Sequence, residues 1–483
     1  MIHAELLIDG HFIGGPCDQA TGKQVVRNPF DGSIVGTAAE GGLSELRGCL
    51  DAADEAFRSW RLSSTDQRRN LLRRIAELVR DRSEELVELL TNEVGKPVTW
   101  SKGEVSRLAI TFDIAADELD TWPSHDRRWN LADLGADPRG ADYYSLLAKF
   151  PVGPILAIVP YNWPFNLAAH KLAPALATGN TVILKPSPLA PISTLTLARI
   201  IHEAGCPPGV VNAWNGPSQV IQKVSHDPRC RMVSFTGSPE VGWKIKSDLP
   251  PETKVTLELG GNGYAIICED ADLDWATDRC VAGGYGYAGQ VCIAVQHVLA
   301  ESGVYEQVRR HLVDKTNACS WGDPRQINTV CGPMISADAA DRVESWVEEA
   351  VAAGAEVIAG GGREGNVVKP TLLEHVPPTV NLATEEVFGP VVSLSPFHQL
   401  SDAVDRVNRG NYGIHAGVFT QKEFQVNEAF QRLEVGGVVI NDYPTLRFDN
   451  LPYGGLKQSG FGREGVRYAM DEMTEWKSLV KRL

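Results

Sequence analysis

Between residues 143 and 440, short apolar runs alternate with segments that have helical spacing, and this alternation constrains the fold more than any other feature. Apolar runs between helices are typical of parallel strands that are buried on both faces. The sequence therefore predicts an α/β protein with parallel sheets covered by helices. The expected strands are residues 155–159, 181–184, 210–212, 232–235, 265–267, 298–300, 356–358 and 391–395.

The first part of the chain differs from this pattern. Short strands are expected at residues 6–8 and 24–28, followed by three helices. The helices are residues 43–60, one that begins near Ser64 and ends at Gly95-Lys96-Pro97, and residues 100–119. Residues 122–142 are polar and rich in turn formers, and they interrupt the α/β pattern as an excursion. With 483 residues, the chain is long enough for two or three domains.

Charge and composition exclude several classes of partner. Acidic residues number 61 and basic residues 46, and the net charge of −15 opposes binding to nucleic acid. No apolar run approaches the length of a membrane span, and the first ten residues do not have the pattern of a signal peptide. Nine cysteines without a CxxC pair argue against a disulfide framework and against a zinc site. We expect a cytoplasmic protein with reduced thiols and no metal.

Two glycine-rich matches to the dinucleotide fingerprint GxGxxG occur at residues 360–365 and 460–465. The fingerprint requires a preceding strand and a following helix whose N-terminus receives the pyrophosphate. The first match leads into Val367-Val368-Lys369-Pro370, which is not a helix start, and the second has no strand before it. Both are expected to be chance matches, so any nucleotide must bind in another way.

Three positions combine reactive or polar side chains with unusual surroundings. Cys292 follows a glycine-rich segment that leads into an apparent helix, where a dipole would lower the pKa of its thiol. Glu258 ends an apolar strand at Gly260-Gly261, where burial would raise the pKa of its carboxyl. Asn162 stands between a strand and a helix. Each residue taken alone also has a structural explanation, as a small core residue, a turn carboxylate or a turn former.

Taken together, seven motifs resemble those of the aldehyde dehydrogenase superfamily across essentially the whole chain. They occur in the family's order and spacing, with one departure at Gly263-Tyr264, where the family more often has a small residue and then proline. The motifs are Pro160-Tyr161-Asn162-Trp163-Pro164, Lys185-Pro186-Ser187, Phe235-Thr236-Gly237-Ser238, Leu257-Glu258-Leu259-Gly260-Gly261, Gly289-Gln290-Val291-Cys292, Glu386-Val387-Phe388-Gly389-Pro390 and residues 452–460, PYGGLKQSG.

The resemblance implies a catalytic role for each of the three positions. The Cys292 thiolate would attack an aldehyde, and Asn162 and the backbone N–H of Cys292 would stabilise the oxyanion. Hydride would then pass to a nicotinamide and leave a thioester. Glu258 would activate the water that hydrolyses the thioester to a carboxylate.

The resemblance also implies NAD+ or NADP+ as cofactor, bound on a Rossmann-like sheet. Lys185 would meet the adenosine ribose, Ser238 the pyrophosphate and Glu386 the nicotinamide ribose. Family members that prefer NAD+ often carry Glu three positions after the lysine, and Pro188 stands there. The preference therefore stays open. The remaining residues expected in the cofactor cleft are Pro160, Trp163, Ser187, Gly216, Leu259 and Phe388.

The substrate is expected to be a small anionic or hydroxylated aldehyde. Arg107 and Arg447 fall in regions that line the substrate tunnel of the family, and two guanidinium groups could bind an anionic head group. Either arginine could instead form a surface or interface ion pair. The C-terminal tail resembles the branch that acts on lactaldehyde, glyceraldehyde 3-phosphate and phosphonoaldehydes.

By the same resemblance, residues 1–122 and 143–255 form the cofactor domain and residues 256–440 the catalytic domain. Residues 123–142 and 441–483 would form an oligomerisation arm, and a homodimer or homotetramer is expected. One alternative is a coenzyme A-acylating dehydrogenase, against which Glu258 argues. A non-catalytic relative and a cysteine hydrolase with His297 as base are the others; His297 lies in an expected strand.

Overall fold

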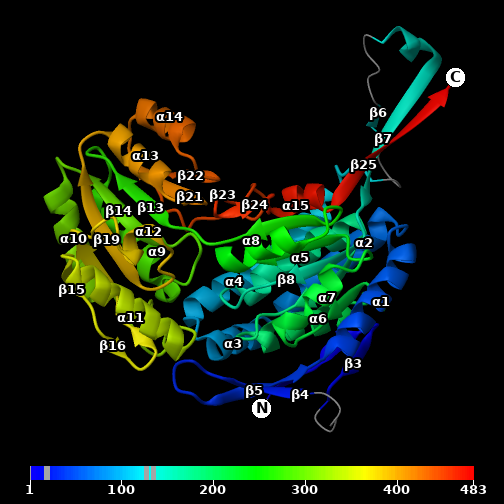
Figure 1. The fold of residues 1–483 in the computed structure, drawn as a ribbon, viewed down its shortest axis with the longest axis horizontal. Coiled ribbons are helices and arrows are strands. Elements are labelled where there is room, and N and C mark those ends of the chain that lie inside the picture. Colours follow the sequence, from blue (N-terminus) through cyan, green and yellow to red (C-terminus); the bar gives the residue numbers. More distant parts are fainter. Residues whose placement is uncertain (1, 16–21, 125–129, 132–136) are drawn as a thin grey trace.

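The computed structural model describes residues 2–15, 22–124, 130–131 and 137–483. It has two α/β lobes and an arm that projects from the first lobe (Figure 1). Half of the excursion at residues 123–142, and Cys17, lie outside the described residues. Among the described helices, none has the length and hydropathy that crossing a bilayer requires.

The first lobe is built on an eight-stranded sheet with a parallel centre. Strands β12, β11, β8, β9 and β10 run parallel, while β24 and β2 are antiparallel to their neighbours. In sheet order the strands are β24 (Gly460–Phe461), β12 (Lys254–Glu258), β11 (Met232–Thr236), β8 (Pro154–Ile158), β9 (Thr181–Lys185), β10 (Val211–Ala213), β2 (Leu6–Ile8) and β3 (His11–Ile13).

Helices cover both faces of this sheet, as the sequence predicts. Ile155 and Ala157 of β8 pack into a core with α2 to α6, whereas Leu156 packs into a second core with α1. This period of two follows from the pleat, which directs successive side chains to opposite faces. The helices are α1 (Leu43–Trp60), α2 (Thr65–Asp81), α3 (Ser83–Val94), α4 (Val98–Glu118), α5 (Pro164–Thr178), α6 (Pro191–Glu203), α7 (Gln222–Ser225) and α8 (Pro239–Asp248).

The second lobe contains a seven-stranded sheet that is parallel except at β15. Its order is β15 (Glu356–Gly360), β18 (Thr371–Glu374), β19 (Val391–Phe397), β14 (Val295–Glu301), β13 (Gly263–Ile267), β21 (His415–Phe419) and β22 (Gly437–Ile440). The surrounding helices are α9 (Leu273–Tyr285), α10 (Tyr305–Ala318), α11 (Ala337–Ala352), α12 (Asn381–Thr384), α13 (Leu400–Arg409) and α14 (Glu423–Arg432).

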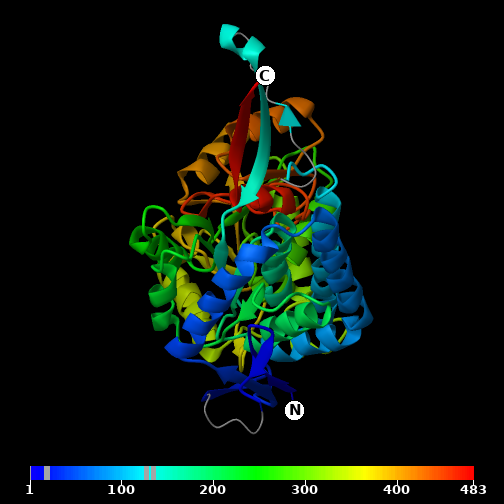
Figure 2. The same ribbon diagram turned by 90° about the vertical axis from the view of Figure 1, so that its right-hand side faces the viewer.

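The arm is a three-stranded sheet that extends away from the body of the molecule (Figure 2). β7 (Tyr143–Pro151) pairs along its whole length with β25 (Thr474–Arg482), and β6 (Asn130–Leu131) adds a short edge. Residues 143–151 therefore lie in the arm and not in the cofactor sheet to which the sequence analysis assigned them. The physical reason is the long antiparallel pairing with the C-terminal strand, which no local pattern reveals.

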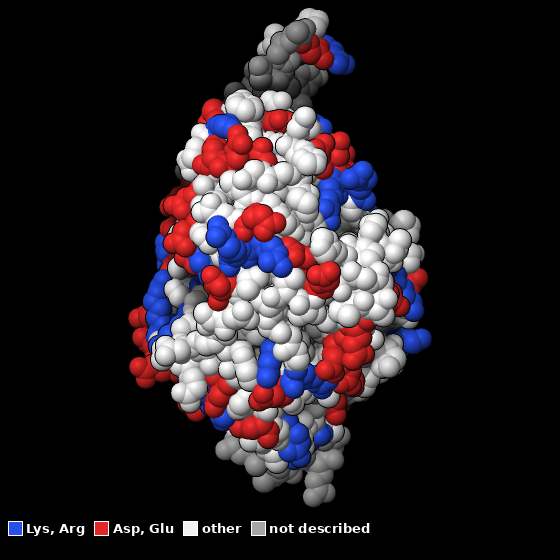
Figure 3. Space-filling view, turned by 90° about the vertical axis from the view of Figure 1, so that its left-hand side faces the viewer, with Lys and Arg blue, Asp and Glu red and all other residues white. Residues whose placement is uncertain are grey.

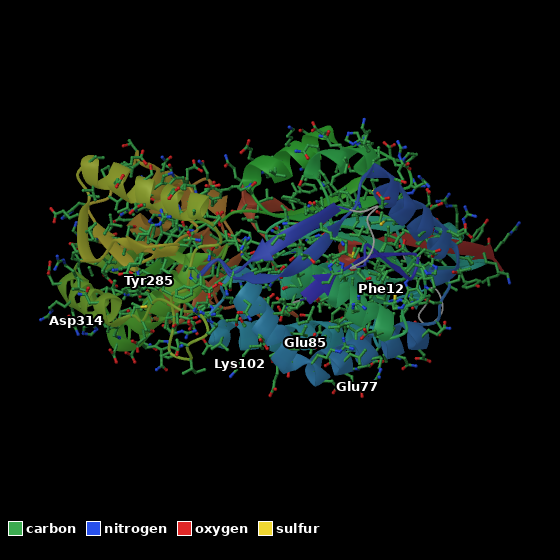
Figure 4. All side chains as sticks on the ribbon, turned by 90° about the horizontal axis from the view of Figure 1, so that it is seen from below. Phe12, Glu77, Glu85, Lys102, Tyr285 and Asp314 are labelled. Atoms are coloured by element: carbon green, nitrogen blue, oxygen red, sulfur yellow. The ribbon has the colours of Figure 1, made fainter. Side chains whose placement is uncertain are left out.

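A small sheet of β1 (Ile2–Ala4), β4 (Gly22–Arg27) and β5 (Ile34–Glu40) lies beneath the first lobe when the molecule is viewed as in Figure 1. Seen from below, it reaches toward the second lobe (Figure 4). The turn between β4 and β5 contacts that lobe, because Asn366 donates a hydrogen bond of 2.8 Å to the Pro29 carbonyl. Asp31 also pairs with Arg325 at 3.0 Å.

The remaining elements are short. Near the arm, α15 (Val466–Glu472) precedes β25. β16 (Arg363–Glu364) pairs with β17 (Val367–Val368), and β20 (Tyr412–Gly413) pairs with β23 (Leu456–Lys457). The described 3-10 turns are η1 (Pro138–Asp142), η2 (Ser218–Val220) and η3 (Gly286–Gly289).

Candidate active site

The register of the first sheet brings the predicted cofactor and base residues to one edge. Ile158 pairs with Lys185, and Thr236 pairs with Glu258, so β8, β9, β11 and β12 end at the same level. The segments that follow them carry Asn162 and Ser238. Carboxyl edges of parallel sheets are where open α/β folds bind ligands.

The amino ends of the second sheet face this edge. Cys292 lies three residues before β14, and Glu386 lies five residues before β19. The two edges are close together, because a Cβ on Gly261, just before β13, would stand 2.2 Å from the Cys292 carbonyl oxygen. Only glycine fits there.

Two cavities meet at this junction, and Asn162, Leu167 and Cys292 line both. The larger has a volume of about 1130 Å³ and extends over the carboxyl edge of the first sheet. The smaller, of about 400 Å³, lies toward α4 and the segment before β23. The thiol is therefore partly exposed, at the boundary between two separate spaces.

The loop before Cys292 has a strained backbone. Tyr287 and Ala288 have φ values of 51° and 53°, in the left-handed region that disfavours residues with a Cβ. The buried Gln290 side chain holds the loop, accepting from the Ile335 N–H at 3.0 Å and donating to the Pro333 carbonyl at 3.2 Å. Cys292 is not at a helix start, so the predicted helix and its dipole are wrong. The segment leads into strand β14.

The electrostatic environment of Cys292 also differs from the prediction. Burial raises the pKa of its thiol to about 12, and no helix dipole offsets this effect. The hydrogen bond with Tyr453 acts in the opposite direction, with the Tyr453 hydroxyl 2.9 Å from Sγ. The positive charge of Arg447 also favours the thiolate.

Asn162 lies in the turn between β8 and α5, within reach of the Cys292 loop. Its Nδ2 donates a hydrogen bond of 2.9 Å to the Gln290 carbonyl. An amide nitrogen has two N–H groups, so one fixes the side chain and the other is available to a ligand. Proline at the first position of α5 fixes where the helix begins.

A buried ion pair supports the same turn. Glu104 of α4 accepts hydrogen bonds from the N–H groups of Phe165 and Asn166 at 2.9 and 3.1 Å, at the start of α5. Lys96 pairs with Glu104, and its ammonium lies 4.0 Å from the Trp163 ring centroid. The pair and the helix N-terminus together fix the turn that carries Asn162.

Glu258, the last residue of β12, is buried, and neither carboxyl oxygen has a hydrogen-bond partner among the described residues. Burial raises the pKa of its carboxyl well above the usual value, as the sequence predicts, and the negative charge of Glu464 adds to this effect. Such a carboxyl takes up a proton more readily than an exposed one. Gly454 lies so close that a Cβ there would be 3.0 Å from Oε1.

Behind Glu258 lies an ionic cluster that the sequence analysis missed. Glu464 pairs with Lys171 at 2.8 Å and with Arg447 at 3.5 Å. Although burial opposes its ionisation, these positive charges lower the pKa of Glu464 to about 2. A lysine in the mostly apolar helix α5 was the available signal, and Glu464 lies within the second glycine-rich chance match.

Most of the predicted cofactor residues line the larger cavity: Pro160, Lys185, Ser187, Ser238, Leu259, Glu386 and Phe388. Burial lowers the pKa of Lys185 to about 8, and its Nζ donates to the Pro186 carbonyl at 2.9 Å. Burial raises the pKa of Glu386 to about 8, and its Oε1 accepts from the Gly261 N–H at 3.0 Å. Arg342, which the sequence analysis did not single out, also lines this cavity.

Two predicted cofactor residues lie elsewhere. Gly216 is buried against Gly41 and Trp214, and Ser218 lines the cavity in its place. Trp163 lines the smaller cavity, because Lys96 and Arg107 hold its ring on the side of α4. Neither glycine-rich chance match contributes a residue to the lining of the larger cavity.

Arg107 and Arg447 both line the smaller cavity, and they share a counter-ion. Asp449 accepts two hydrogen bonds from Arg107 and lies 3.8 Å from Arg447 Nε. Although burial opposes ionisation, hydrogen bonds from His170 and Arg107 hold the pKa of Asp449 below its usual range. Arg447 stacks on Tyr453, with its guanidinium carbon 3.7 Å from the ring centroid.

His297 lies in β14, as expected, and packs away from the thiol. Its Nδ1 is 2.6 Å from the Ser393 hydroxyl, and its ring lies against Tyr264. Burial lowers the pKa of this histidine to about 3. These contacts do not fit a base for Cys292.

Comparison with known proteins shows the family of the chain. Residues 17–479 match the model of the aldehyde dehydrogenase family. The chain is 36% identical over 475 residues to 3-sulfolactaldehyde dehydrogenase of Priestia aryabhattai, covering 98% of both chains. It is 35% identical to a crystal structure of aldehyde dehydrogenase 21 from Physcomitrella patens in complex with the reaction product succinate. That match has a TM-score of 0.95 and covers 99% of this chain and 98% of the other.

A third match is the crystal structure of glyceraldehyde-3-phosphate dehydrogenase from Methanocaldococcus jannaschii complexed with NADP. The two chains are 34% identical, with a TM-score of 0.90 and coverage of 96% and 100%. The resemblance found in the sequence is thereby confirmed: this chain belongs to the aldehyde dehydrogenase family.

Proposed function

We propose that the protein oxidises a small anionic or hydroxylated aldehyde to its carboxylic acid with NAD+ or NADP+. The single observation that carries the proposal is that Cys292 lies between two cavities. An aldehyde in the smaller cavity and a nicotinamide in the larger would meet at its sulfur. Proximity of this kind supplies a large part of enzymatic rate enhancement.

In this reaction, Sγ of Cys292 bonds to the aldehyde carbon, and the carbonyl oxygen becomes an oxyanion. The second N–H of the Asn162 amide and the backbone N–H of Cys292 donate to that oxyanion. The strained loop and Gln290 hold the sulfur in place, so little reorganisation accompanies the attack.

The residues of the larger cavity fit a dinucleotide. Among the described residues, Lys185 Nζ donates one hydrogen bond, to the Pro186 carbonyl, and it can also donate to ribose hydroxyls. Ser238 precedes α8 without capping it, which leaves its hydroxyl and the helix N-terminus for a pyrophosphate. One carboxyl oxygen of Glu386 accepts a hydrogen bond from the Gly261 N–H, and the other can accept one from a ribose hydroxyl. When bound, the nicotinamide accepts the hydride. Ser187, Pro188 and Ser218 bring no acidic group beside Lys185, so a 2′-phosphate is compatible with the site.

Glu258 is the proposed base for hydrolysis of the thioester. Its raised pKa suits the abstraction of a proton from water near neutral pH. The carboxyl is also without a hydrogen-bond partner among the described residues, so no bond within them has to break first. This residue argues against the alternative in which coenzyme A takes the acyl group, and against a non-catalytic relative.

Arg107 and Arg447 are the proposed anion-binding residues of the smaller cavity. The ionic cluster has three positive side chains, Lys171, Arg107 and Arg447, and two paired carboxylates, Asp449 and Glu464. It therefore retains a positive charge while Glu258 is protonated. An anionic head group would compete with Asp449 for the two guanidinium groups. The relatives named for sulfolactaldehyde and for the product succinate act on anionic compounds, which supports this class.

We further propose a homodimer or homotetramer in which the arm contacts a second copy. β25 and β22 are edge strands of their sheets. β25 exposes Trp476, Leu479 and Val480, a combination that is unfavourable in an isolated subunit. The boundaries expected from the sequence, 1–122 with 143–255, 256–440, and 123–142 with 441–483, are retained except for residues 143–151.

The test is the absorbance of reduced nicotinamide with a panel of aldehydes and each cofactor in turn. Anionic members, such as 3-sulfolactaldehyde and succinic semialdehyde, are compared with lactaldehyde and propanal. Activity is expected to disappear in Cys292→Ala and to persist in Cys319→Ala, since Cys319 is a partly exposed thiol outside both cavities. Arg107→Ala is expected to raise the KM for anionic members alone.

Each outcome decides a different part of the proposal. Faster turnover of neutral aldehydes would support the dehydrogenase and contradict the role of the arginines. Folded protein without activity with either cofactor would contradict the dehydrogenase. Activity that needs added coenzyme A would favour the acylating alternative.

A further inference from the structure

Tyr453 is the side chain that hydrogen-bonds to the Cys292 sulfur, and neither the motifs nor the proposed reaction gives it a role. Its hydroxyl lies 2.9 Å from Sγ, and the side chain is 3% exposed. Tyr453 follows Pro452 in the segment between α14 and β23, 161 residues from Cys292. The Tyr453 N–H and carbonyl both bond to Glu464, at 2.9 and 2.7 Å, which fixes its backbone.

The direction of this hydrogen bond depends on the charge of the sulfur. A neutral thiol can either donate to the phenol or accept from it. A thiolate has no proton, so only the phenol O–H can donate. Hydrogen bonds to charged acceptors are stronger than those between neutral groups, and the contact therefore favours the thiolate over the thiol.

The surroundings of the ring hold the phenol in place and keep it protonated. The Arg447 guanidinium carbon lies 3.7 Å from the centroid of the ring, and His415 packs edge-on at 5.2 Å. Burial raises the pKa of the Tyr453 hydroxyl well above its usual value, although the positive charge of Arg447 opposes this shift. The phenol therefore keeps its proton and can donate it in a hydrogen bond to the sulfur.

We propose that Tyr453 is a catalytic residue whose hydroxyl donates a hydrogen bond to the Cys292 thiolate and keeps the sulfur at the boundary of the two cavities. No proton passes from the phenol to sulfur. Among the described residues, the phenol supplies the side-chain hydrogen bond to Sγ. This inference rests on the proposed role of Cys292 as nucleophile.

The experiment measures alkylation of Cys292 by iodoacetamide, in the intact protein, by mass spectrometry of the peptide that contains it. The variant is Tyr453→Phe, which removes the hydroxyl and keeps the ring against Arg447. The matched control is Tyr285→Phe, because Tyr285 is equally buried, precedes the same loop and bonds to Thr316 at 3.1 Å (labelled in Figure 4).

Over a range around pH 8, Tyr453→Phe is expected to react about tenfold more slowly than the unaltered protein, which is one pKa unit. The slope of the logarithm of the alkylation rate against pH should be the same in both proteins. Tyr285→Phe is expected to react at the unaltered rate.

If the role of Tyr453 is only structural, the change in the alkylation rate is expected in the opposite direction. If the hydroxyl only filled space, its removal would open the site, and alkylation would be unchanged or faster; either result overturns the proposal. Equal slowing in Tyr285→Phe would overturn it too. The measurement uses neither aldehyde nor nicotinamide, so its result is independent of whether the dehydrogenase reaction is observed.

Discussion

The side-chain amide of Asn162 combines two tasks at the scale of a single residue. One N–H is bonded to the Gln290 carbonyl, and the other is the proposed oxyanion donor. Asn162→Ala is expected to lower kcat by about 10²–10³-fold, the usual effect of losing one such donor, with a smaller change in KM. The measurement is steady-state kinetics with the best aldehyde of the panel.

The alkylation rate of Cys292 provides the control for this variant. It should be unchanged, because the amide acts on the oxyanion and not on the thiolate. A kcat within twofold of the unaltered enzyme would contradict the role of Asn162.

Glu258 leads to a prediction about pH. Its pKa is raised in the folded protein, so the basic form increases only as pH rises through that value. The rate of hydrolysis should rise with pH accordingly, and Glu258→Gln should remove the rise and most of the rate. A profile in Glu258→Gln that is parallel to that of the unaltered enzyme would contradict the assignment.

Stability should change with the same group. Between the pKa of Glu in the unfolded chain and the raised folded pKa, the native state binds more protons, so stability decreases as pH rises. Glu258→Gln has no carboxyl at this position, so this decrease in stability with rising pH is removed. Its apparent Tm should therefore increase relative to the unaltered protein as pH rises, when both are measured at one protein concentration. A difference in Tm that is constant with pH would contradict the raised pKa.

Sequence reasoning found the candidate catalytic residues but not their partners. Cys292, Glu258 and Asn162 stand in local motifs, whereas the Tyr453 contact spans 161 positions and the Arg107–Asp449 contact spans 342. No periodicity carries information over such distances. Gly216 and Trp163 do not line the larger cavity, because both are fixed by contacts distant in sequence. The Gly216 backbone packs against Gly41 and Trp214, and Lys96 and Arg107 hold the Trp163 ring toward α4.

At the scale of elements, the buried pair Lys96–Glu104 links α4 to the start of α5. Glu104→Gln would leave the Lys96 charge buried without a partner, and this is expected to cost about 3–5 kcal/mol. The double variant Lys96→Met/Glu104→Gln should lose less than the single one. Urea denaturation at fixed protein concentration measures both.

An exposed pair serves as the control. Glu55→Gln breaks the contact with Arg58 on α1, where both side chains are mostly exposed, and should leave stability unchanged. If the double variant were less stable than Glu104→Gln, the pair would not act as a unit.

Elements with strong local signals were predicted well. Helix α1 has the expected bounds, since its apolar spacing is regular, and the alternation of β8, β9 and β11 with helices gave a parallel sheet. The single helix expected up to Gly95 is divided at Arg82 into α2 and α3, with no glycine or proline to mark the break. The sequence predicts a helix start at Cys292, and the structure has a turn there, because positive φ at Tyr287 and Ala288 has no sequence signature.

At the scale of the whole molecule, the structure of one chain does not explain why the arm exposes apolar side chains on β25. The double variant Leu479→Lys/Val480→Lys places charges on the exposed strand β25 and should reduce the molecular mass in solution. Ile327→Lys, an exposed apolar residue of the second lobe, is the control and should not change it. Light scattering after size-exclusion chromatography gives the masses, and an unchanged mass for both would contradict the proposed role of the arm.

Charge on the face of the second lobe gives no comparable signal. In Figure 3, acidic and basic side chains are interspersed on that face, and no basic field gathers there. The net charge of −15 of the whole chain opposes contact with polyanions.

The two cavities that meet at the Cys292 sulfur have a consequence for kinetics. In the proposed reaction, the larger cavity would hold the dinucleotide, and the smaller would hold the aldehyde and then the acyl group on Cys292. The two ligands would therefore enter and leave on different sides of the sulfur. A compound that binds in the smaller cavity should compete with the aldehyde and not with the dinucleotide. Binding of either ligand can therefore be inhibited separately.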